Sequence, residues 1–455
     1  MLTFLAFAMI VSFIVLLSMK KLSVFNALTL VPLVFGVIAV FATGATMSDL
    51  FSWIKDGIFY TVDYEGQSTS MGVISPGLTI LFSILYFDLM LGVGLFDPVA
   101  AFFIKMAKGD PLKVLMSTVM VASVVSFNGD TTTTIIICTS AFINLYRQMG
   151  LKLIYLAIVI VAPIGIWNQL PWGGPTIASA TAQGIEVNEL FATLLPGLLA
   201  AQVAVIAITY LLGKKERKRL GWSAADAKAV SPEQLDQMIA AVRDKDVELK
   251  RPKLFAFNLV LTLVAVVLLI QGEIHGSIIF MLASAIALVV NYPKVEESSQ
   301  RLEDLAADVL PTAVITLGAG VFSGVLTGSG MATALANFIA GIIPTQLSSH
   351  MAPIYAVIAT PAVCFLPQDA FYFGIASVMK DVMAQFGISA TQAAVASMVG
   401  QSFRLVSPVI PALYMLCGEC KLNFTDFMKE YGKYYGIALL VLYLVVYGVV
   451  GALPF

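Results

Sequence analysis

Long apolar stretches separated by short polar breaks run through the whole chain. A helix needs about 20 apolar residues to cross a hydrocarbon core roughly 30 Å thick. The first stretch lacks the basic start and small-residue cleavage site of a signal peptide, so it is read as a spanning helix. Membrane-spanning helices are predicted at 2–19, 23–45, 73–96, 152–185, 190–213, 254–271, 275–292, 309–330, 390–418 and 435–453.

Two further apolar segments, 111–147 and 351–386, are too long for one span and carry a polar interruption. Irregular backbone at membrane depth is tolerated where protein or a cavity satisfies its polar groups. Both segments are therefore predicted to be re-entrant hairpins. Each half of the chain then holds five spans and one hairpin, and because five is odd the halves insert with opposite orientation. The sequence predicts an all-α polytopic membrane protein built from two inverted repeats.

The repeat is also visible in individual residues, at offsets of 236 to 239 positions. Single coincidences of glycine or proline carry little weight, but several in register indicate a duplicated unit. The matching pairs are Gly92–Gly94 with Gly328–Gly330, Met149–Leu151 with Phe386–Ile388, Pro171 with Pro408, and Asp130 with Asp369.

Composition excludes a soluble protein, since 59% of the 455 residues are hydrophobic, only 12% are charged and the mean hydropathy is +0.91. Basic residues favour the cytoplasmic side of a membrane. One orientation places all 26 lysines and arginines inside except Lys55, Lys380 and Arg404. It predicts a cytoplasmic loop at 214–253 and both termini outside.

Asp130 and Asp369 are isolated acids at the interruptions of the two hairpins. A bare carboxylate in hydrocarbon costs about 2.5–3.5 kcal/mol on insertion scales, so such a residue usually serves the site around it. Duplicated acids at broken apolar segments are typical of transporters whose substrate site lies near the midplane. A buried acid satisfied only by helix ends is the structural alternative.

Each half contains two breaks, at 128–132 and 168–176 and again at 365–370 and 404–411. Proline and paired glycines interrupt a helix there, which exposes half-helix N-termini that suit carboxylates and carbonyls that suit cations. The predicted substrate-binding residues are Asn128, Gly129, Thr131, Thr132, Gly173, Gly174, Thr176, Gln368, Arg404 and Ser407. The predicted residues for cation or proton coupling are Asp130, Asp369, Asn168 and Asp88.

Arg404 is the predicted anion clamp, because a guanidinium holds a carboxylate through two hydrogen bonds and stays charged when buried. Pairing with an acid or reaching to an interface is its alternative. For Asp88 a structural partnership with a basic residue is as plausible as proton or metal binding. Cys417 and Cys420 have redox-motif spacing without the surrounding βαβ pattern, so they are read as packing residues.

Several strings resemble the citrate–divalent metal/proton symporter family of the ion-transporter superfamily, from about Leu2 to the C-terminus. The most specific are the Trp-Gly-Gly-Pro and Asp-Ala-Phe-Tyr-Phe-Gly strings. The strings are Leu95–Pro98, Lys108–Val114, Gly129–Thr133, Leu170–Thr176 and Asp369–Gly374.

The resemblance implies cotransport of citrate, complexed with Mg²⁺ or Ca²⁺, with protons. The protein by itself would not bind the metal. Asp130 and Asp369 would be candidate contacts to a cation that is already bound to citrate. The superfamily implies a homodimeric elevator. Its mobile transport domain would be 73–186 with 309–418, and its scaffold 1–72, 187–308 and 419–455.

Four sites, one of them two residues long, depart from the family pattern. Asn128 replaces an acid at the first tip, Pro367-Gln368 replaces Ser-Asn at the second, Arg404 stands where histidine is common, and Gly92 replaces an acid. Losing acids and gaining an arginine favours a more negative anion, which leaves the metal complex the weakest of the implied properties.

The predicted function is a non-enzymatic secondary transporter of citrate or a similar di- or tricarboxylate. It would lie in the cytoplasmic membrane without a resident cofactor or nucleic-acid partner, and proton or sodium would be the coupling ion. A sodium-coupled dicarboxylate transporter or an exchanger without obligatory metal is the alternative. An intramembrane aspartic protease would need acids about 3 Å apart sharing a proton. A channel is a further alternative, but occluded broken helices are more typical of a transporter that works by alternating access.

Overall fold

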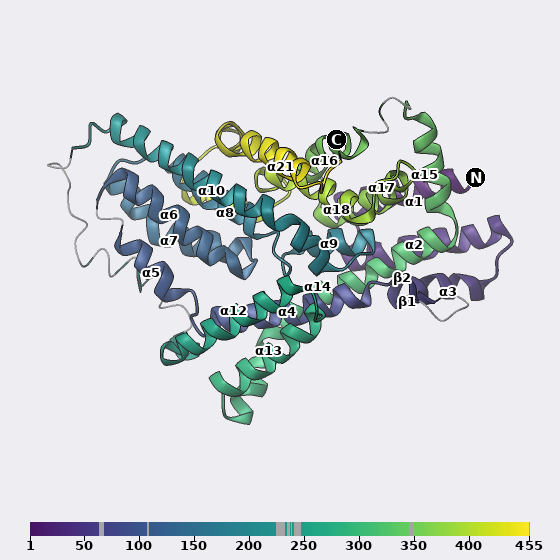
Figure 1. The fold of residues 1–455 in the computed structure, drawn as a ribbon, viewed down its shortest axis with the longest axis horizontal. Coiled ribbons are helices and arrows are strands. Elements are labelled where there is room, and N and C mark those ends of the chain that lie inside the picture. The colour runs from purple at the N-terminus through teal and green to yellow at the C-terminus, as the bar shows by residue number, and fades with distance from the viewer. Residues whose placement is uncertain are drawn as a thin grey trace.

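The computed structural model describes all residues except 63–67, 107–108, 224–232, 234–236, 238, 241–246, 345–346, 348–349 and 455. Lys108 and about half of the predicted 214–253 loop therefore lie outside the described residues. The described part of the chain is largely helical, with one small antiparallel pair of strands, and it forms an elongated body (Figure 1).

The first half of the chain runs from a pair of N-terminal helices through the first hairpin to a long helix. Its elements are α1 (Leu2–Ser18), α2 (Val24–Thr43), α3 (Met47–Ile58), β1 (Tyr60–Val62), β2 (Ser68–Met71), α4 (Ile74–Gly92), α5 (Asp97–Lys105), α6 (Pro111–Val125), η1 (Ser126–Asn128), α7 (Thr131–Gln148), α8 (Leu153–Trp167), α9 (Gly174–Gln183) and α10 (Val187–Arg219).

The second half runs through the second hairpin and the second broken helix to the C-terminal helix α21. Its elements are η3 (Val247–Leu249), η4 (Pro252–Leu254), α12 (Phe255–Gln271), α13 (Gly276–Asn291), α14 (Val295–Gly328), α15 (Met331–Ile342), α16 (Met351–Phe365), η6 (Ala370–Ala376), α17 (Ser377–Ala384), α18 (Ala390–Val399), η7 (Gly400–Val406), α19 (Pro411–Glu419), α20 (Phe424–Tyr431), η8 (Gly432–Gly436) and α21 (Ile437–Val449).

The predicted fold class is confirmed. In the described part of the chain, seven helices or helix pairs are long and apolar enough to span a membrane, and shorter apolar helices accompany them. Both predicted hairpins are present, as α6–α7 and as α16 with η6 and α17. Both predicted broken helices are present as well, as α8–α9 and as α18 and α19 around η7.

Glycines at equivalent positions give the two halves the same helix ends. Gly94 after α4 and Gly330 after α14 have φ values of +81° and +77°. Gly150 after α7 and Gly387 after α17 have φ values of +64° and +76°, a left-handed geometry that glycine adopts without a Cβ penalty. The repeat noticed in the sequence is thus a repeat of backbone conformation.

Hydropathy alone misjudged several helix lengths. α10 continues to Arg219, and α14 begins at Val295 although its predicted span starts at residue 309. The added turns carry charged side chains, so they fall outside the apolar stretch by which a span is predicted. They nevertheless continue the hydrogen bonding of the helix. The short helices α3, α5 and α15 were not predicted, because they are too brief to register as spans.

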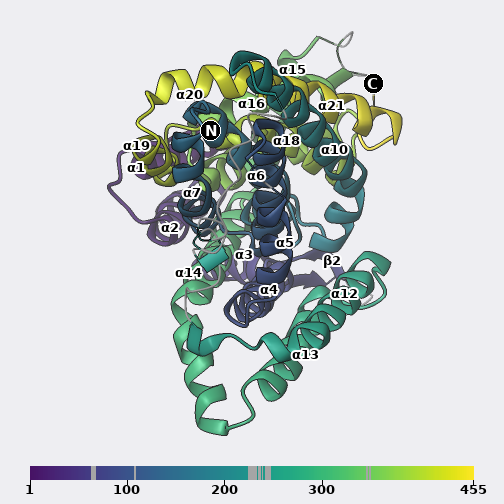
Figure 2. The same cartoon turned by 90° about the vertical axis from the view of Figure 1, so that its left-hand side faces the viewer.

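The helices pack as two groups. α4 and α14 pack against each other and against α2, α3 and α13. α10 packs along α6, α8 and α21. Viewed from its end, the molecule shows α12 and α13 at the bottom and the α6–α10 region above them (Figure 2).

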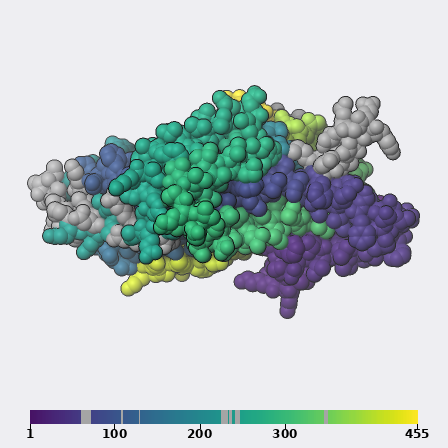
Figure 3. Space-filling view, turned by 90° about the horizontal axis from the view of Figure 1, so that it is seen from below, coloured from purple at the N-terminus to yellow at the C-terminus, as the bar shows by residue number. Residues whose placement is uncertain are grey.

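The outer side of α12 and α13 is apolar and exposed. Val260 and Leu263 of α12 are 59% and 55% exposed, and Leu282 and Val289 of α13 are 54% and 69% exposed. This teal-to-green part of the chain covers the middle of one face (Figure 3). In a multi-pass membrane protein, such a surface suits contact with lipid.

Loops predicted to share a side of the membrane contact one another. On the predicted inner side, Arg219 donates to the Gly150 carbonyl (2.6 Å) and Arg147 to the Glu419 carbonyl (2.9 Å). On the predicted outer side, Ser75 bonds both Glu186 (2.9 Å) and His275 (2.7 Å). These contacts agree with the predicted grouping of the loops into two sets, one on each side of the membrane. Which set faces the cytoplasm stays a prediction.

Candidate functional site

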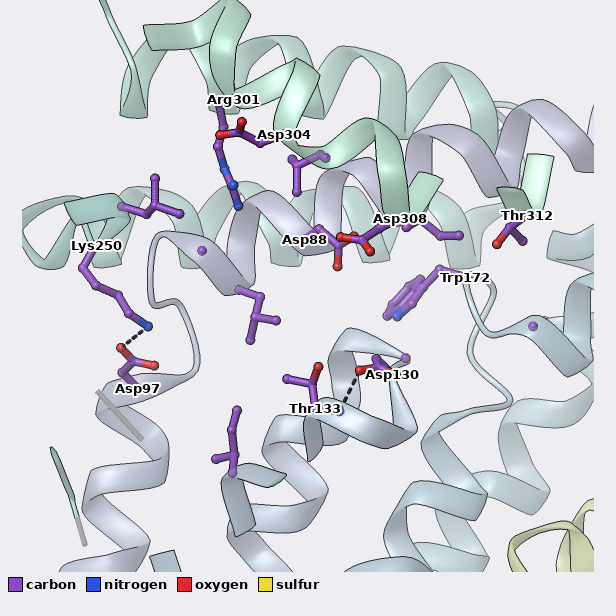
Figure 4. A pocket seen from close by; sticks show the side chains of 18 of the residues that line it. Asp88, Asp97, Asp130, Thr133, Trp172, Lys250, Arg301, Asp304, Asp308 and Thr312 are labelled. Carbon is purple, nitrogen blue, oxygen red and sulfur yellow. Dashed lines mark hydrogen bonds and ion pairs between the residues drawn. The ribbon is translucent and has the colours of Figure 1, made fainter. Parts of the chain in front are cut away.

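A cavity of about 560 Å³ lies between the α4–α14 pair and the tip of the first hairpin (Figure 4). One wall comes from α4 and α14, and the facing wall from α7 and α9. Charged and polar residues on its surface are Asp88, Asp97, Asp130, Thr133, Lys250, Arg301, Asp304, Asp308 and Thr312.

The first hairpin tip is shaped by Gly129 and Asp130. After η1, Gly129 adopts a φ of +80°, which reverses the chain direction. Asp130 then caps α7, accepting hydrogen bonds from the amides of Thr132 (3.1 Å) and Thr133 (2.7 Å). These bonds satisfy helix-end donors and hold the carboxylate at the cavity wall, where Figure 4 shows it.

The break between α8 and α9 closes against this tip. A Cβ at Gly173 would lie 1.9 Å from the Asn168 carbonyl oxygen, so only glycine fits the turn. Thr176 of α9 donates to the Gln169 carbonyl (2.8 Å) and ties the two half-helices together. The start of α9 at Gly174 is part of the cavity wall.

Trp172 links the break, the hairpin tip and α4. Its indole Nε1–H donates to the Phe127 carbonyl (2.7 Å). Its ring stacks on Phe87 of α4 at 3.7 Å between centroids and meets the edge of Phe280 of α13 at 5.8 Å. Trp172 therefore lies where the two helix groups meet.

The second hairpin tip contacts the first broken helix but lies outside the cavity. A Cβ at Gly174 would come within 3.1 Å of the Gln368 amide nitrogen, so the two tip regions approach closely. Asp369 precedes η6 and is partly exposed. Arg404 is in electrostatic range of Asp369.

Arg404 binds backbone in this conformation. It is buried, and its Nη1 donates to the carbonyls of Val363 and Leu366, both at 2.8 Å. These carbonyls end α16, where a helix lacks internal donors. The predicted anion clamp thus caps a helix end in this conformation, a contact that neither the clamp role nor its alternatives anticipated, and its role toward a ligand stays a prediction.

Four of the predicted site residues line the cavity, namely Asp88, Gly129, Asp130 and Gly174. The others lie around it: Thr131 and Thr132 form the first turn of α7, Asn168 ends α8, and Ser407 ends η7. Asn128 ends η1, and its side chain is outside the described part of the structure. The residues beyond the cavity wall are Asn128, Thr131, Thr132, Asn168, Gly173, Thr176, Gln368, Asp369, Arg404 and Ser407.

Sequence reasoning missed the polar face of α14. Arg301, Asp304 and Asp308 line the cavity, and Figure 4 shows Asp308 beside Asp88 of α4. Their spacing of three and four positions places them on one helical face. That spacing was visible in the sequence, but the residues precede the predicted span and were read as part of a loop.

Lys250 and Asp97 also line the cavity. They form an ion pair in which Lys250 Nζ lies 2.9 Å from Asp97 Oδ2. Among the described residues, no three histidine, cysteine or acidic side chains are placed to hold a metal ion. The cavity wall therefore offers hydrogen-bond donors, carboxylates and one arginine to a polar ligand.

A model of a citrate transporter family matches residues 13–400 of the chain. A citrate transporter of Bacillus subtilis is 35% identical over 430 residues, covering 94% of both chains. A Mg²⁺/citrate complex secondary transporter of the same organism is 34% identical over 442 residues, covering 97% of both.

Two solved structures share the fold. The YdaH transporter of Alcanivorax borkumensis superposes with a TM-score of 0.57, at 13% identity, over 92% of this chain and 98% of its own. MtrF of Neisseria gonorrhoeae gives 0.56 at 12% identity, over 91% and 94%. At such low identity the likeness concerns architecture alone.

Proposed function

Since the chain belongs to the citrate transporter family, we propose that it carries citrate across the membrane as a complex with a divalent cation, in symport with protons. The family identifies a multi-pass membrane transporter, in agreement with the expectation of a protein that is not an enzyme. The name of one relative, a Mg²⁺/citrate complex secondary transporter, supports the metal complex.

The observation that carries the proposal is the charge balance of the cavity. Its volume of about 560 Å³ suits a small ligand. Five carboxylates line it, against two basic side chains, and Lys250 is already paired with Asp97. A free tricarboxylate would be repelled by this lining, whereas a bound Mg²⁺ or Ca²⁺ cancels part of the ligand's charge.

The tip residues fit a metal–citrate ligand. Asp130 presents a carboxylate toward the cavity, and oxygen ligands are those that Mg²⁺ and Ca²⁺ prefer. The start of α9 at Gly174 offers backbone amides to a citrate carboxylate. Asp88, Asp369 and Asn168 remain the proposed residues for proton or sodium coupling.

An elevator movement of a homodimer is proposed for the transport step. The helix packing favours a scaffold of α2, α3, α4, α13 and α14, and a transport unit that includes both hairpins, both broken helices, α10 and α21. This division differs from the sequence-based one for α4, α14, α10 and α21. The cavity would then lie between the two bodies.

The proposed location is the cytoplasmic membrane, with the 214–253 loop inside and both termini outside. The decisive experiment is uptake of labelled citrate into proteoliposomes, with Mg²⁺ or Ca²⁺ present or absent, crossed with an inward proton or sodium gradient. Uptake that needs both a divalent cation and a proton gradient is expected. Metal-independent, sodium-driven uptake would instead identify a sodium-coupled carboxylate transporter, and metal-independent exchange an antiporter.

A further inference from the structure

We propose that Arg301 is a substrate-binding residue, which holds a free carboxylate of the metal–citrate complex at the mouth of the cavity. This inference rests on the proposed function and adds to it a contact outside the hairpins and broken helices. The residue comes from α14, a helix whose first turns were not expected to reach the site.

The guanidinium of Arg301 is placed by the shape of α4. A Cβ at Gly92 would lie 2.7 Å from Arg301 Nη2 and 3.5 Å from Cζ. The arginine therefore lies against α4 at a position without a side chain, and it forms part of the cavity wall, where Figure 4 draws it. Any larger residue at position 92 would displace the guanidinium.

Arg301 has donor capacity to spare. Lys250, the other basic residue on the wall, is held by Asp97, but the ion pairs found among the described residues do not include Arg301. Its Nε–H is buried and bonds to no described residue. Because the Arg301 side chain is part of the cavity wall and its guanidinium has no carboxylate in ion-pair contact among the described residues, an anionic ligand could take that place.

The charged residues are also unevenly distributed along the cavity wall. Arg301, with Asp304 beside it, lies toward the end of the cavity lined by Lys250 and Asp97, whereas Asp88, Asp308 and Asp130 lie toward the hairpin tip (Figure 4). A metal–citrate complex has a cationic centre and free carboxylates. Its metal would face the acids and its carboxylate would face Arg301, which fixes one orientation of the ligand.

The test compares Arg301→Gln, Arg301→Lys and Gly92→Ala with the unmodified chain in proteoliposome uptake of Mg²⁺–citrate. We expect Arg301→Gln to raise KM about 10- to 100-fold with a smaller change in maximal rate, and Arg301→Lys to recover part of the affinity. Gly92→Ala keeps the charge but moves it, and should raise KM about 3- to 10-fold.

Gly77→Ala is the matched control on α4, because a Cβ there meets only ordinary contacts at 3.7 and 3.9 Å. Binding of Mg²⁺–citrate to the purified variants, followed by thermal stabilisation, gives a second readout that is independent of turnover. An unchanged KM in Arg301→Gln, or a lower unfolding temperature as its only effect, would overturn the inference. Absence of citrate uptake by the unmodified chain would overturn the proposed function, and the inference with it.

Discussion

At the scale of single residues, the two tips use their polar side chains differently. Asp130 caps a helix and presents its carboxylate to the cavity. Arg404, at the break of the second broken helix, instead donates from Nη1 to carbonyls at the end of α16, beside the second tip. Chemical type marked both residues as important, but only the contacts separate a residue that lines the cavity from one that bonds backbone beside the second tip.

Asp130→Asn should abolish coupled uptake while leaving the fold intact. Asparagine caps a helix about as well as aspartate, so α7 keeps its start, but the negative charge at the cavity is lost. We expect transport to fall more than tenfold in the proteoliposome assay, with little change in thermal unfolding. Asp49→Asn in the exposed capping box of α3 is the control. Undiminished uptake by Asp130→Asn would remove this residue from the mechanism.

Arg404→Gln should destabilise the protein by about 1–3 kcal/mol, because two buried carbonyls lose a charged donor. Thermal or denaturant unfolding in detergent measures this. Arg147→Gln is a matched control, since Arg147 makes a similar bond to the Glu419 carbonyl at an exposed position. If Arg404→Gln were as stable as the control but bound citrate weakly, the sequence-based role as an anion clamp would be restored.

At the scale of secondary-structure elements, close helix packing depends on glycine. Gly320, Gly324 and Gly328 recur every four positions on the face of α14 that meets α3. A Cβ at Gly324 would lie 2.1 Å from the Trp53 carbonyl oxygen, and one at Gly328 would lie 2.4 Å from the Trp53 ring. Small residues let membrane helices approach this closely, which is why α14 stays with the scaffold helices in our division.

Gly324→Ala should therefore lower stability by about 1–3 kcal/mol through overpacking against backbone, which cannot move aside like a side chain. Gly341→Ala in α15 is the control, because nothing lies within 4 Å of its Cβ position and alanine favours a helix. Unfolding of the purified variants measures both changes. Equal stability of the two variants would show that α3 and α14 do not depend on this contact.

At the scale of the whole molecule, an ion pair on the predicted outer side joins distant segments. His275, before α13, lies 3.2 Å from Glu186, before α10, and Ser75 of α4 bonds both. The hydrogen bond that His275 donates to the Glu186 carboxylate raises the pKa of His275 above its ordinary 6.5 despite partial burial. Burial opposes ionisation of Glu186, but its bonds to His275 and Ser75 outweigh this and lower its pKa below 4.5.

This pair should stabilise the protein most at about pH 5 to 6.5, where both partners are charged. The histidine's share is lost as the pH rises through its raised pKa, and the glutamate's share as the pH falls through its lowered pKa. His275→Gln is expected to cost about 0.5–1 kcal/mol near pH 6 and less at pH 9, measured by unfolding. His350→Gln serves as the control histidine. A cost independent of pH would show that the contact acts by packing alone.

The sequence alone predicted more of the fold than of the site. Apolar length, the lopsided basic residues and the repeated glycines determined the membrane class, both hairpins, both breaks and the inverted repeat, because each is a local consequence of bilayer thickness or backbone geometry. The same local rules marked Asp130, Asp369 and Arg404 as unusual. They could not determine which of these residues face a common cavity.

The tertiary structure decided what depends on contacts between distant segments. It placed Asp88, Asp130 and Gly174 around one cavity and added Arg301, Asp304 and Asp308, because α14 continues as a helix beyond its apolar window. It also turned Arg404 toward the end of α16. Polar turns of a long helix have no hydropathy signal, and the partner of a buried charge is set by packing. The sequence by itself therefore determined the class and layout of the protein, and the tertiary structure decided which charged residues line the cavity.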